Sequence, residues 1–304
     1  MSVKLVSRIL LPLALVLQGA GSGAFADSTD EGSVGHLLWQ PSMNVFRRYA
    51  VDAEQMFEFY GGVLGLEQLQ SFDVGGTTGV HRFRAGNSEV KLTGRVDGRE
   101  YVPGGVRDAT GLRLLTFFYP DKAPLIERFR AHGLAEPQFE ALPGGEREVA
   151  LVEDPDGHAV ELVVAPNAPA ELYDSIEIGL TVEDIEESRE FYREFVGLEE
   201  LPPVDDPVHD TTKYPYRHGT TTVSLRSFDA ELPADTGTGG IQYVVTDAAF
   251  VDRLAKERGV PIDQPLSTLR GFDLRTIWLD DPDGITNYFA ETGQSRRAAA
   301  QSSE

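Results

Sequence analysis

Two similar turns direct attention to the carboxylates that could do chemistry in this chain. The stretch EDPDGHAVELV covers residues 153–163, and DDPDGITNYFA covers residues 280–290. Only the first places a carboxylate, Glu161, seven residues after the first aspartate of DPDG; the second has Tyr288 there. A carboxylate on a strand can bind a metal ion, act as a base or accept hydrogen bonds from a ligand. The two turns therefore predict different chemistry.

The DPDG turns themselves have a structural explanation. Proline fixes a turn φ, aspartate bonds its own backbone, and glycine supplies a positive φ before the next strand. The spacing of oxygen ligands that a calcium loop requires is missing. We expect the turn to occur twice because a whole domain was duplicated.

A larger repeat supports duplication, because an aspartate followed by a helical pattern and then a glycine occurs four times. The aspartates are Asp52, Asp121, Asp184 and Asp247, and the glycines are Gly65, Gly133, Gly197 and Gly259. Each helical pattern follows a β-like run (NVFRRYAV, LRLLTFFY, IEIGLTV and IQYVVT), and alternating segments come after it. The sequence predicts a β-α-β-β-β unit used four times.

Similarity between units predicts how they group into domains. FEFYGGVLGLEQL in the first unit resembles REFYREFVGLEEL in the third, and units two and four end in the DPDG turns. We expect an α+β chain with two tandem domains, residues 43–166 and 174–292, joined by a linker at 167–173. Residues 27–42 form a lead-in and residues 293–304 a disordered tail in this interpretation.

The first 26 residues are typical of a secretory signal peptide. Lys4 and Arg8 precede the apolar run ILLPLALVLQGAG, and Ala24-Phe25-Ala26 forms a cleavage signal. We expect export to the periplasm or the extracellular space; a retained membrane anchor is the alternative. The chain has no cysteine, so core burial rather than disulfides must stabilise the exported protein.

The amino-acid composition limits the classes of molecule that the protein can bind. The formal charge is −22, and removing the two basic residues of the leader makes it −24. Such a charge repels nucleic acid and anionic membranes, so we expect neither as a partner after cleavage. A hydrophobic content of 41% suffices to build proper cores.

With its EDPDGHAVELV stretch, its D-helix-FY-x-x-x-x-GLE stretch and its four units, the chain resembles the vicinal oxygen chelate (VOC) superfamily. This superfamily includes glyoxalase I, extradiol dioxygenases and bleomycin-resistance proteins. The resemblance implies paired modules that curl a sheet around a cavity. It also implies a divalent metal in that cavity, held by His and Glu side chains from the first and last strands of the modules.

The resemblance can be carried over one position at a time. In the first domain the ligand positions fall on Val45, Lys91, Leu112 or Leu114, and Glu161; in the second they fall on Glu177, Ser224, Gly240 and Tyr288. A stable divalent site needs at least three converging N or O ligands. Neither domain supplies them, so we expect no metal cofactor. If iron, manganese, nickel or zinc is bound, Glu161, His81 or Glu177 are the candidate ligands.

These departures suggest binding groups instead. If Lys91 and Glu161 face one cavity, the ammonium group could stand in the place of the metal; in the alternative, Lys91 points to solvent. Glu177, Ser224 and Tyr288 would form a polar wall in the second domain. His81 could reach Glu161 if both point inward, but a packing or surface role is the favoured interpretation of a single histidine on a strand. His209 and His218 lie in DDPVHDTTKYPYRHG, for which a surface loop is the favoured interpretation and a cavity rim the alternative.

Two functional classes follow. The first is an exported protein that binds a small molecule in a cavity without the usual metal; the missing ligands and the predicted export favour it. The second is a metal-dependent dioxygenase or glyoxalase-type lyase with an altered ligand set, which the four-module length favours. Pairing of domains within one chain or in a homodimer is left open.

Overall fold

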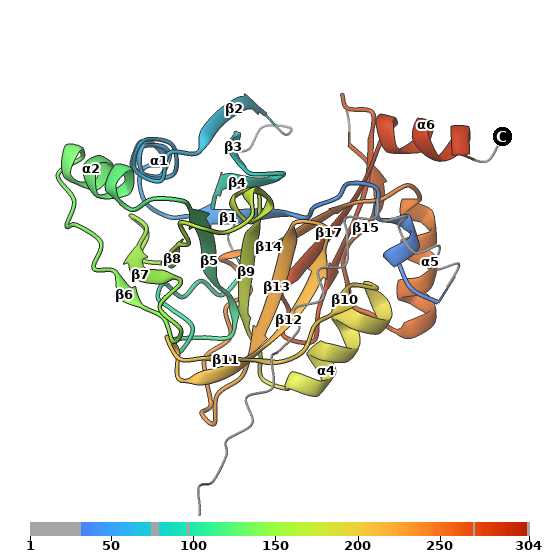
Figure 1. Ribbon diagram of the computed structural model, residues 1–304. Coiled ribbons are helices and arrows are strands. Elements are labelled where there is room, and N and C mark those ends of the chain that lie inside the picture. The colour runs from blue at the N-terminus through green and yellow to red at the C-terminus, as the bar shows by residue number, and fades with distance from the viewer. Residues whose placement is uncertain (1–31, 74–78, 96–97, 270, 303–304) are drawn as a thin grey trace, which may run out of the picture.

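The computed structural model describes residues 32–73, 79–95, 98–269 and 271–302. The predicted signal peptide lies outside the described residues. Among the described helices none is long and apolar enough to cross a membrane. Figure 1 shows helices α1 and α2, from the first half of the chain, at one end of the molecule and α4 and α5, from the second half, at the other.

The predicted unit is present four times, and its elements have the following bounds. The first module contains β1 (Asn44–Tyr49), α1 (Ala53–Phe57) with a π-helical turn (Glu58–Val63), β2 (Glu67–Phe72), β3 (Val80–Ala85) and β4 (Ser88–Gly94). The second contains β5 (Gly111–Tyr119), α2 (Ala123–Ala131), β6 (Glu140–Ala141), β7 (Glu148–Glu153) and β8 (Ala159–Val164). The third contains β9 (Ile176–Thr181), α4 (Ile185–Glu190) with a π-helical turn (Phe191–Phe195), β10 (Glu199–Glu200), β11 (Val204–Asp206), β12 (Thr211–His218) and β13 (Thr221–Arg226). The fourth contains β14 (Gly239–Val244), α5 (Ala248–Arg258), β15 (Ile262–Thr268), β16 (Leu274–Asp280) and β17 (Thr286–Thr292).

The ends of the helices follow the sequence signals. Asp52, Asp184 and Asp247 cap their helices, and each side chain accepts a hydrogen bond from a backbone N–H of the first turn. Asp121 accepts from the N–H of Ala123 at 2.9 Å. All four glycines expected to end the helices have a positive φ, between 69° and 79°. The capping and stop signals are therefore confirmed.

Two large sheets combine modules from opposite halves of the chain. The β1–β14 sheet has the strand order β15-β16-β17-β14-β1-β4-β3-β2, so it joins the first module to the fourth. The β5–β9 sheet has the order β10-β12-β13-β9-β5-β8-β7-β6, so it joins the second module to the third. The central pairs, β1 with β14 and β5 with β9, are antiparallel. Side chains that share a sheet therefore come from both halves of the sequence.

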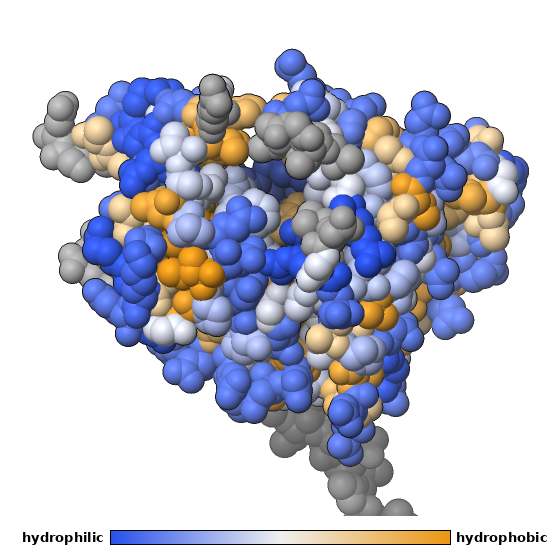
Figure 2. Space-filling model, turned by 180° about the vertical axis from the view of Figure 1, so that it is seen from behind, coloured by the Kyte–Doolittle hydropathy of each residue, from blue (hydrophilic) through white to orange (hydrophobic). Residues whose placement is uncertain are grey.

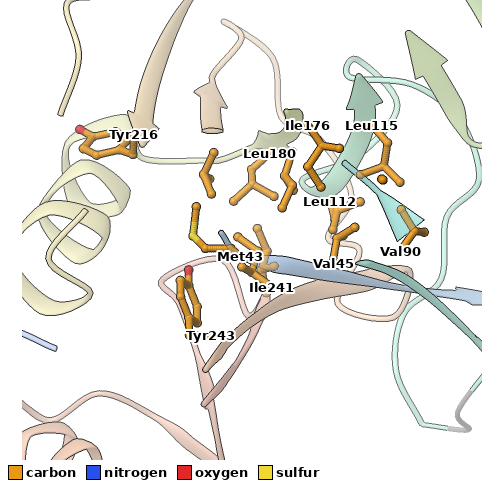
Figure 3. Close-up of a cluster of buried hydrophobic side chains, with 14 of the residues drawn as sticks. Met43, Val45, Val90, Leu112, Leu115, Ile176, Leu180, Tyr216, Ile241 and Tyr243 are labelled. Atoms are coloured by element: carbon orange, nitrogen blue, oxygen red, sulfur yellow. The ribbon is translucent and has the colours of Figure 1, made fainter. Parts of the chain in front are cut away.

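One hydrophobic cluster connects the two sheets (Figure 3). Val45 of β1 and Ile241 of β14 lie in this cluster with Leu112 and Leu115 of β5 and Leu180 of β9. Because neighbouring side chains along a strand point to opposite faces, the residues between these core positions face away from the cluster. We call the face of each sheet that is turned away from the core its polar face.

The first DPDG turn is anchored by a buried ion pair. A guanidinium nitrogen of Arg47 lies 3.0 Å from a carboxylate oxygen of Asp154, and both side chains are fully buried. The hydroxyl of Tyr60 donates to the same oxygen at 3.1 Å. Arg47 therefore gives this buried carboxylate a cationic partner, which offsets the cost of removing the two groups from water.

The second DPDG turn lacks this cation. Asp281 accepts a hydrogen bond from the Tyr192 hydroxyl at 2.8 Å and from the N–H groups of Asp283 and Ile285 at 3.1 and 2.8 Å. None of the described cationic groups forms an ion pair with it. Burial is the largest effect and raises the pKa of Asp281 to about 7.

The expected linker and tail both contain helix. Helix α3 (Ala170–Tyr173) lies within the linker, and α6 (Gly293–Ser302) forms where a disordered tail was expected. The hydroxyl of Ser295 bonds the Thr292 backbone at the start of α6, and Arg296 pairs with Glu291 at 3.0 Å. These contacts join α6 to the last residues of β17, directly before it in the chain, so the disordered tail was a wrong prediction.

We expect Asp281 to make the stability of the protein depend on pH. The pKa of Asp281 is higher in the folded state than in the unfolded state, so its contribution is present below about pH 4 and lost as pH rises through about 7. Between these limits the free energy of unfolding should fall by about 1.4 kcal/mol per pH unit because of this group. Urea unfolding should show that slope disappear in Asp281→Asn.

Asp154→Asn is the matched comparison. It leaves Arg47 buried without its carboxylate and should cost about 3–5 kcal/mol at neutral pH. Equal pH slopes in wild-type protein and Asp281→Asn would contradict this account of the second turn.

Candidate functional site

The polar face of the β5–β9 sheet brings two carboxylates together. Thr116 of β5 lies directly opposite Glu161 of β8 on one side and Glu177 of β9 on the other. Ser224 of β13 follows on the same face, opposite Gly179. Glu161 is 6% exposed and Glu177 is 8% exposed. Glu161, Glu177 and Ser224 are three of the positions onto which the sequence resemblance carries metal ligands.

Glu177 is already neutralised by two cations. The ammonium of Lys213 lies 2.8 and 2.9 Å from its two oxygens, and a guanidinium nitrogen of Arg226 lies 3.4 Å away. Burial by itself raises the pKa of Glu177, but Lys213 and Arg226 outweigh it and hold the pKa below its usual range. Arg226 also pairs with Asp206 at 2.7 Å. This half of the site is a closed ion-pair network.

Glu161 has much weaker partners. The hydroxyl of Thr116 donates to one oxygen at 3.1 Å, and Nε2 of His209 lies 3.5 Å from the other. His209 is 8% exposed, and its Nε2 makes no hydrogen bond within the part of the chain that the structure describes. A buried carboxylate usually has more complete partners than this. Glu161 can therefore accept a further hydrogen bond from a ligand.

A cavity of about 380 Å³ lies next to Leu151, the strand neighbour of Glu161, although Glu161 itself does not line it. Leu151 of β7 lies directly opposite Glu161 and lines this cavity, together with Val149. Pro207 and Val208, which precede His209 in the chain, line it as well. The cavity is in the size range of small-molecule sites, and its lining is mostly apolar, with Gln138 and Glu140 as the polar residues. Among the large hydrophobic side chains, Leu151 is unusually exposed at 48%.

The polar face of the β1–β14 sheet has different groups at the corresponding positions. Asn44 lies opposite Gln242, and Gln242 lies opposite Tyr288. The ammonium of Lys91 donates to Oε1 of Gln242, and Asn44 donates to the same atom at 3.4 Å. The four corresponding positions on this face hold no carboxylate; they are occupied by Asn44, Lys91, Gln242 and Tyr288.

The structure regroups the residues singled out in the sequence. Lys91 belongs to the β1–β14 sheet and Glu161 to the β5–β9 sheet, so the expected Lys91–Glu161 pair is not formed. Glu177 and Ser224 do lie together, but Tyr288 of the expected wall lies on the other sheet. Both differences have one cause: each sheet takes one module from each half of the chain.

Three ligand positions that were inferred by counting residues along the strands also differ in the structure. Val45 points into the core, and its neighbour Asn44 holds the first-strand position; similarly, Gln242 rather than Gly240 lies opposite Tyr288. In β5, Thr116 replaces Leu112 or Leu114 at the position between the carboxylates. A shift of one residue turns a side chain to the other face of a strand, so counting from a helix cap is not accurate enough.

His81 packs as its favoured interpretation predicts, whereas His209 was placed wrongly. The ring of His81 packs 4.0 Å from the ring of Phe57, and its Nδ1 lies 3.1 Å from the Ser71 hydroxyl, so it does not approach Glu161. His209, for which a surface loop was favoured, is buried beside Glu161 instead. Nothing in a polar, proline-containing segment distinguishes a loop that folds over a sheet from an exposed one.

The residues on the β5–β9 sheet do not fit a divalent metal. Two hydroxyls and two carboxylates occupy the four positions, and Lys213 and Arg226 already hold one carboxylate. A stable site needs at least three converging ligands free to bind the ion. The described ranges contain no group of three or more His, Asp or Glu side chains arranged to hold a metal.

Comparisons with known proteins agree with this architecture. The model of the Glyoxalase/Bleomycin resistance protein/Dioxygenase superfamily matches residues 42–162 and 175–289. A lactoylglutathione lyase of Arabidopsis thaliana is 23% identical over 256 residues, which are 77% of this chain and 85% of that protein. A lactoylglutathione lyase of rice, Oryza sativa subsp. japonica, is 26% identical over 46% of this chain and 51% of that protein. The crystal structure of glyoxalase I from Zea mays has a TM-score of 0.63 at 20% identity, over 86% of this chain and 94% of that one. This last likeness concerns the fold alone.

We expect Lys213→Met to weaken the ion-pair network without unfolding the protein. Loss of the charge-assisted hydrogen bonds to Glu177 should cost about 1.5–3 kcal/mol at neutral pH, while Arg226 still partly neutralises the carboxylate. Because the pKa of Glu177 is depressed, its stabilisation is present above about pH 4 and is lost as pH falls through its folded pKa. The difference in unfolding free energy between wild-type and variant should therefore shrink in acid. A difference that stays constant down to pH 3 would contradict the assignment.

Proposed function

This chain belongs to the Glyoxalase/Bleomycin resistance protein/Dioxygenase superfamily, and we propose that it binds a small organic molecule on the polar face of the β5–β9 sheet without a metal ion. The observation that carries the proposal is the buried, incompletely partnered Glu161 carboxylate, whose strand neighbour Leu151 lines a cavity of about 380 Å³. A cavity with one well-placed polar group is the usual form of a small-molecule site.

The site favours a ligand with two parts. A hydrogen-bond donor such as an ammonium, hydroxyl or amide group would bind Glu161, which forms no ion pair with a lysine or arginine among the described residues. An apolar body would lie against Leu151, Val149 and the segment at Pro207–Val208. Glu177 takes no part in this recognition because Lys213 and Arg226 hold it.

The second candidate function is a metal-dependent lyase or dioxygenase with an altered ligand set. It draws on the names of the Arabidopsis and rice relatives, which are lactoylglutathione lyases. Glu161 and His209 would be the groups available to an ion of zinc, nickel, iron or manganese. The cations on Glu177 speak against this candidate, because they occupy the side chain that a third ligand would have to supply.

We further propose that the protein acts after export, since residues 1–26 have the charge, apolar run and cleavage signal of a secretory leader. Amino-terminal sequencing of protein recovered from an exporting host should begin at Asp27. A strongly acidic exported protein would meet small molecules rather than nucleic acid or anionic membrane as its partner.

Benzylamine is a suitable first probe of the Glu161 site, because it joins an ammonium donor to a small apolar ring. We expect calorimetric titration to show saturable binding that weakens at least tenfold, or about 1.4 kcal/mol, in Glu161→Gln. Leu151→Glu should also alter binding, because it changes the cavity wall opposite Glu161. Glu89→Gln, on the other sheet, is the matched control and should bind like wild type.

The outcomes separate the two candidates. Benzylamine binding that is equal in wild type and Glu161→Gln would overturn the proposed site. Metal near one ion per chain in protein purified without chelators, together with lactoylglutathione lyase activity that chelation abolishes, would establish the second candidate instead.

A further inference from the structure

The polar face of the β1–β14 sheet contains a buried ammonium group without a carboxylate of its own. The side chain of Lys91 is 16% exposed, and its nitrogen donates to Gln242. The nearest carboxylate oxygen, from Glu89, is 3.5 Å away. Glu89 is already bound by the guanidinium of Arg82, with Nε 2.8 Å from Oε2. One carboxylate therefore serves two cations.

A third cation, Arg48, lies on the same face, and its charge interacts with Asp263, Asp235 and Asp280 as well as with Arg99. Arg48, which shares the face of Phe46 on β1, is buried and lies 5.1 Å from the centre of the Phe46 ring. Its NH1 donates to the Gly237 carbonyl, and no ion pair with a carboxylate within 4.0 Å is present among the described residues. Burial lowers the pKa of both Lys91 and Arg48, which reflects the cost of holding these charges away from water.

Aromatic rings form the adjoining part of the face. The ring of Trp278 lies 4.8 Å from the ring of Tyr288 and 5.9 Å from that of Phe46. Phe46 reaches across the sheet because Gly240 has no side chain: a Cβ there would lie 2.6 Å from the Phe46 ring and 2.1 Å from the Thr286 carbonyl oxygen. The absence of a side chain at Gly240 therefore allows the Phe46 ring to pack in this position.

Tyr288 supplies a neutral donor at this place. Its side chain is half-buried, and its hydroxyl forms no hydrogen bond with any residue that the structure describes. Burial raises the pKa of Tyr288, so the hydroxyl keeps its proton at neutral pH. A neutral hydroxyl and an ammonium are both donors, and both suit an anionic acceptor.

We propose that the polar face of the β1–β14 sheet is a second ligand site, which binds small aromatic carboxylates. The carboxylate accepts hydrogen bonds from Lys91, whose charge is otherwise under-compensated, and the ring packs against Trp278 and Tyr288. This site is distinct from the proposed Glu161 site, because the two lie on different sheets. The duplicated sheets would then select ligands of opposite charge.

Benzoate is the probe, and Trp278 is the reporter. The chain has two tryptophans, so Trp39→Phe leaves Trp278 as the only one. Benzoate should change the fluorescence of this variant saturably, whereas benzylamine and acetate, which lack the charge or the ring, should not. Adding Lys91→Met should raise the dissociation constant for benzoate at least tenfold. Lys256→Met, which removes an exposed ammonium, is the matched control and should leave it unchanged.

Two further variants provide a replacement for Lys91→Met and a control for the Glu161 site. Should Lys91→Met lose its cooperative unfolding transition, Tyr288→Leu takes its place, since loss of the ring and hydroxyl should also raise the dissociation constant at least tenfold. Glu161→Gln should leave benzoate binding unchanged, so failure of the Glu161 site and failure of this one are distinguishable. The proposal is overturned if benzoate gives no saturable signal, or if a folded Lys91→Met or Tyr288→Leu variant binds it as the parent does.

Discussion

The antiparallel pairing of β5 with β9 and of β1 with β14 is the constraint on which the rest of this molecule depends. These two strand pairs join modules that are distant in the sequence and set their register residue by residue. The pairing of Thr116 with Glu177 brings the carboxylates of β8 and β9 onto one face. The pairing of Asn44 with Gln242 brings Lys91 and Tyr288 onto the same face of the other sheet. Both candidate sites therefore form because each sheet pairs strands from the two halves of the chain.

The energetics of buried charge explain the different states of the two glutamates. Glu177 has exchanged water for an ammonium and a guanidinium, and such a group is stable but chemically saturated. Glu161 lies at the same depth with a hydroxyl and a distant imidazole, so it keeps capacity for another donor.

The surface seen from behind is mostly hydrophilic with scattered hydrophobic groups (Figure 2), in keeping with the acidic composition.

Duplication has preserved the framework and changed the polar groups attached to it. Tyr60 and Tyr192 both donate to a turn aspartate, but Arg47 accompanies only Asp154, and Asp281 has no such cation among the described residues. The polar faces differ in the same manner, with carboxylates on the β5–β9 sheet and an ammonium with aromatic rings on the β1–β14 sheet. Backbone geometry depends on glycine positions and caps that both halves keep, whereas polar side chains on an open face can change without disturbing the core.

The sequence by itself determined the local architecture, because helix caps, glycine stops and strand alternation depend on residues a few positions apart. Asp52, Asp184 and Asp247 cap helices as expected, and the four-module plan follows from such signals. It also indicated that Glu161, Glu177, Ser224, Lys91 and Tyr288 belong to polar faces. Only the tertiary structure decided which of them meet, because each sheet pairs strands from modules that are distant in the sequence. A register shift of one residue would also turn each side chain to the other face of its strand. The burial of His209 beside Glu161 was decided in the same way, by contact with a strand far away in the sequence.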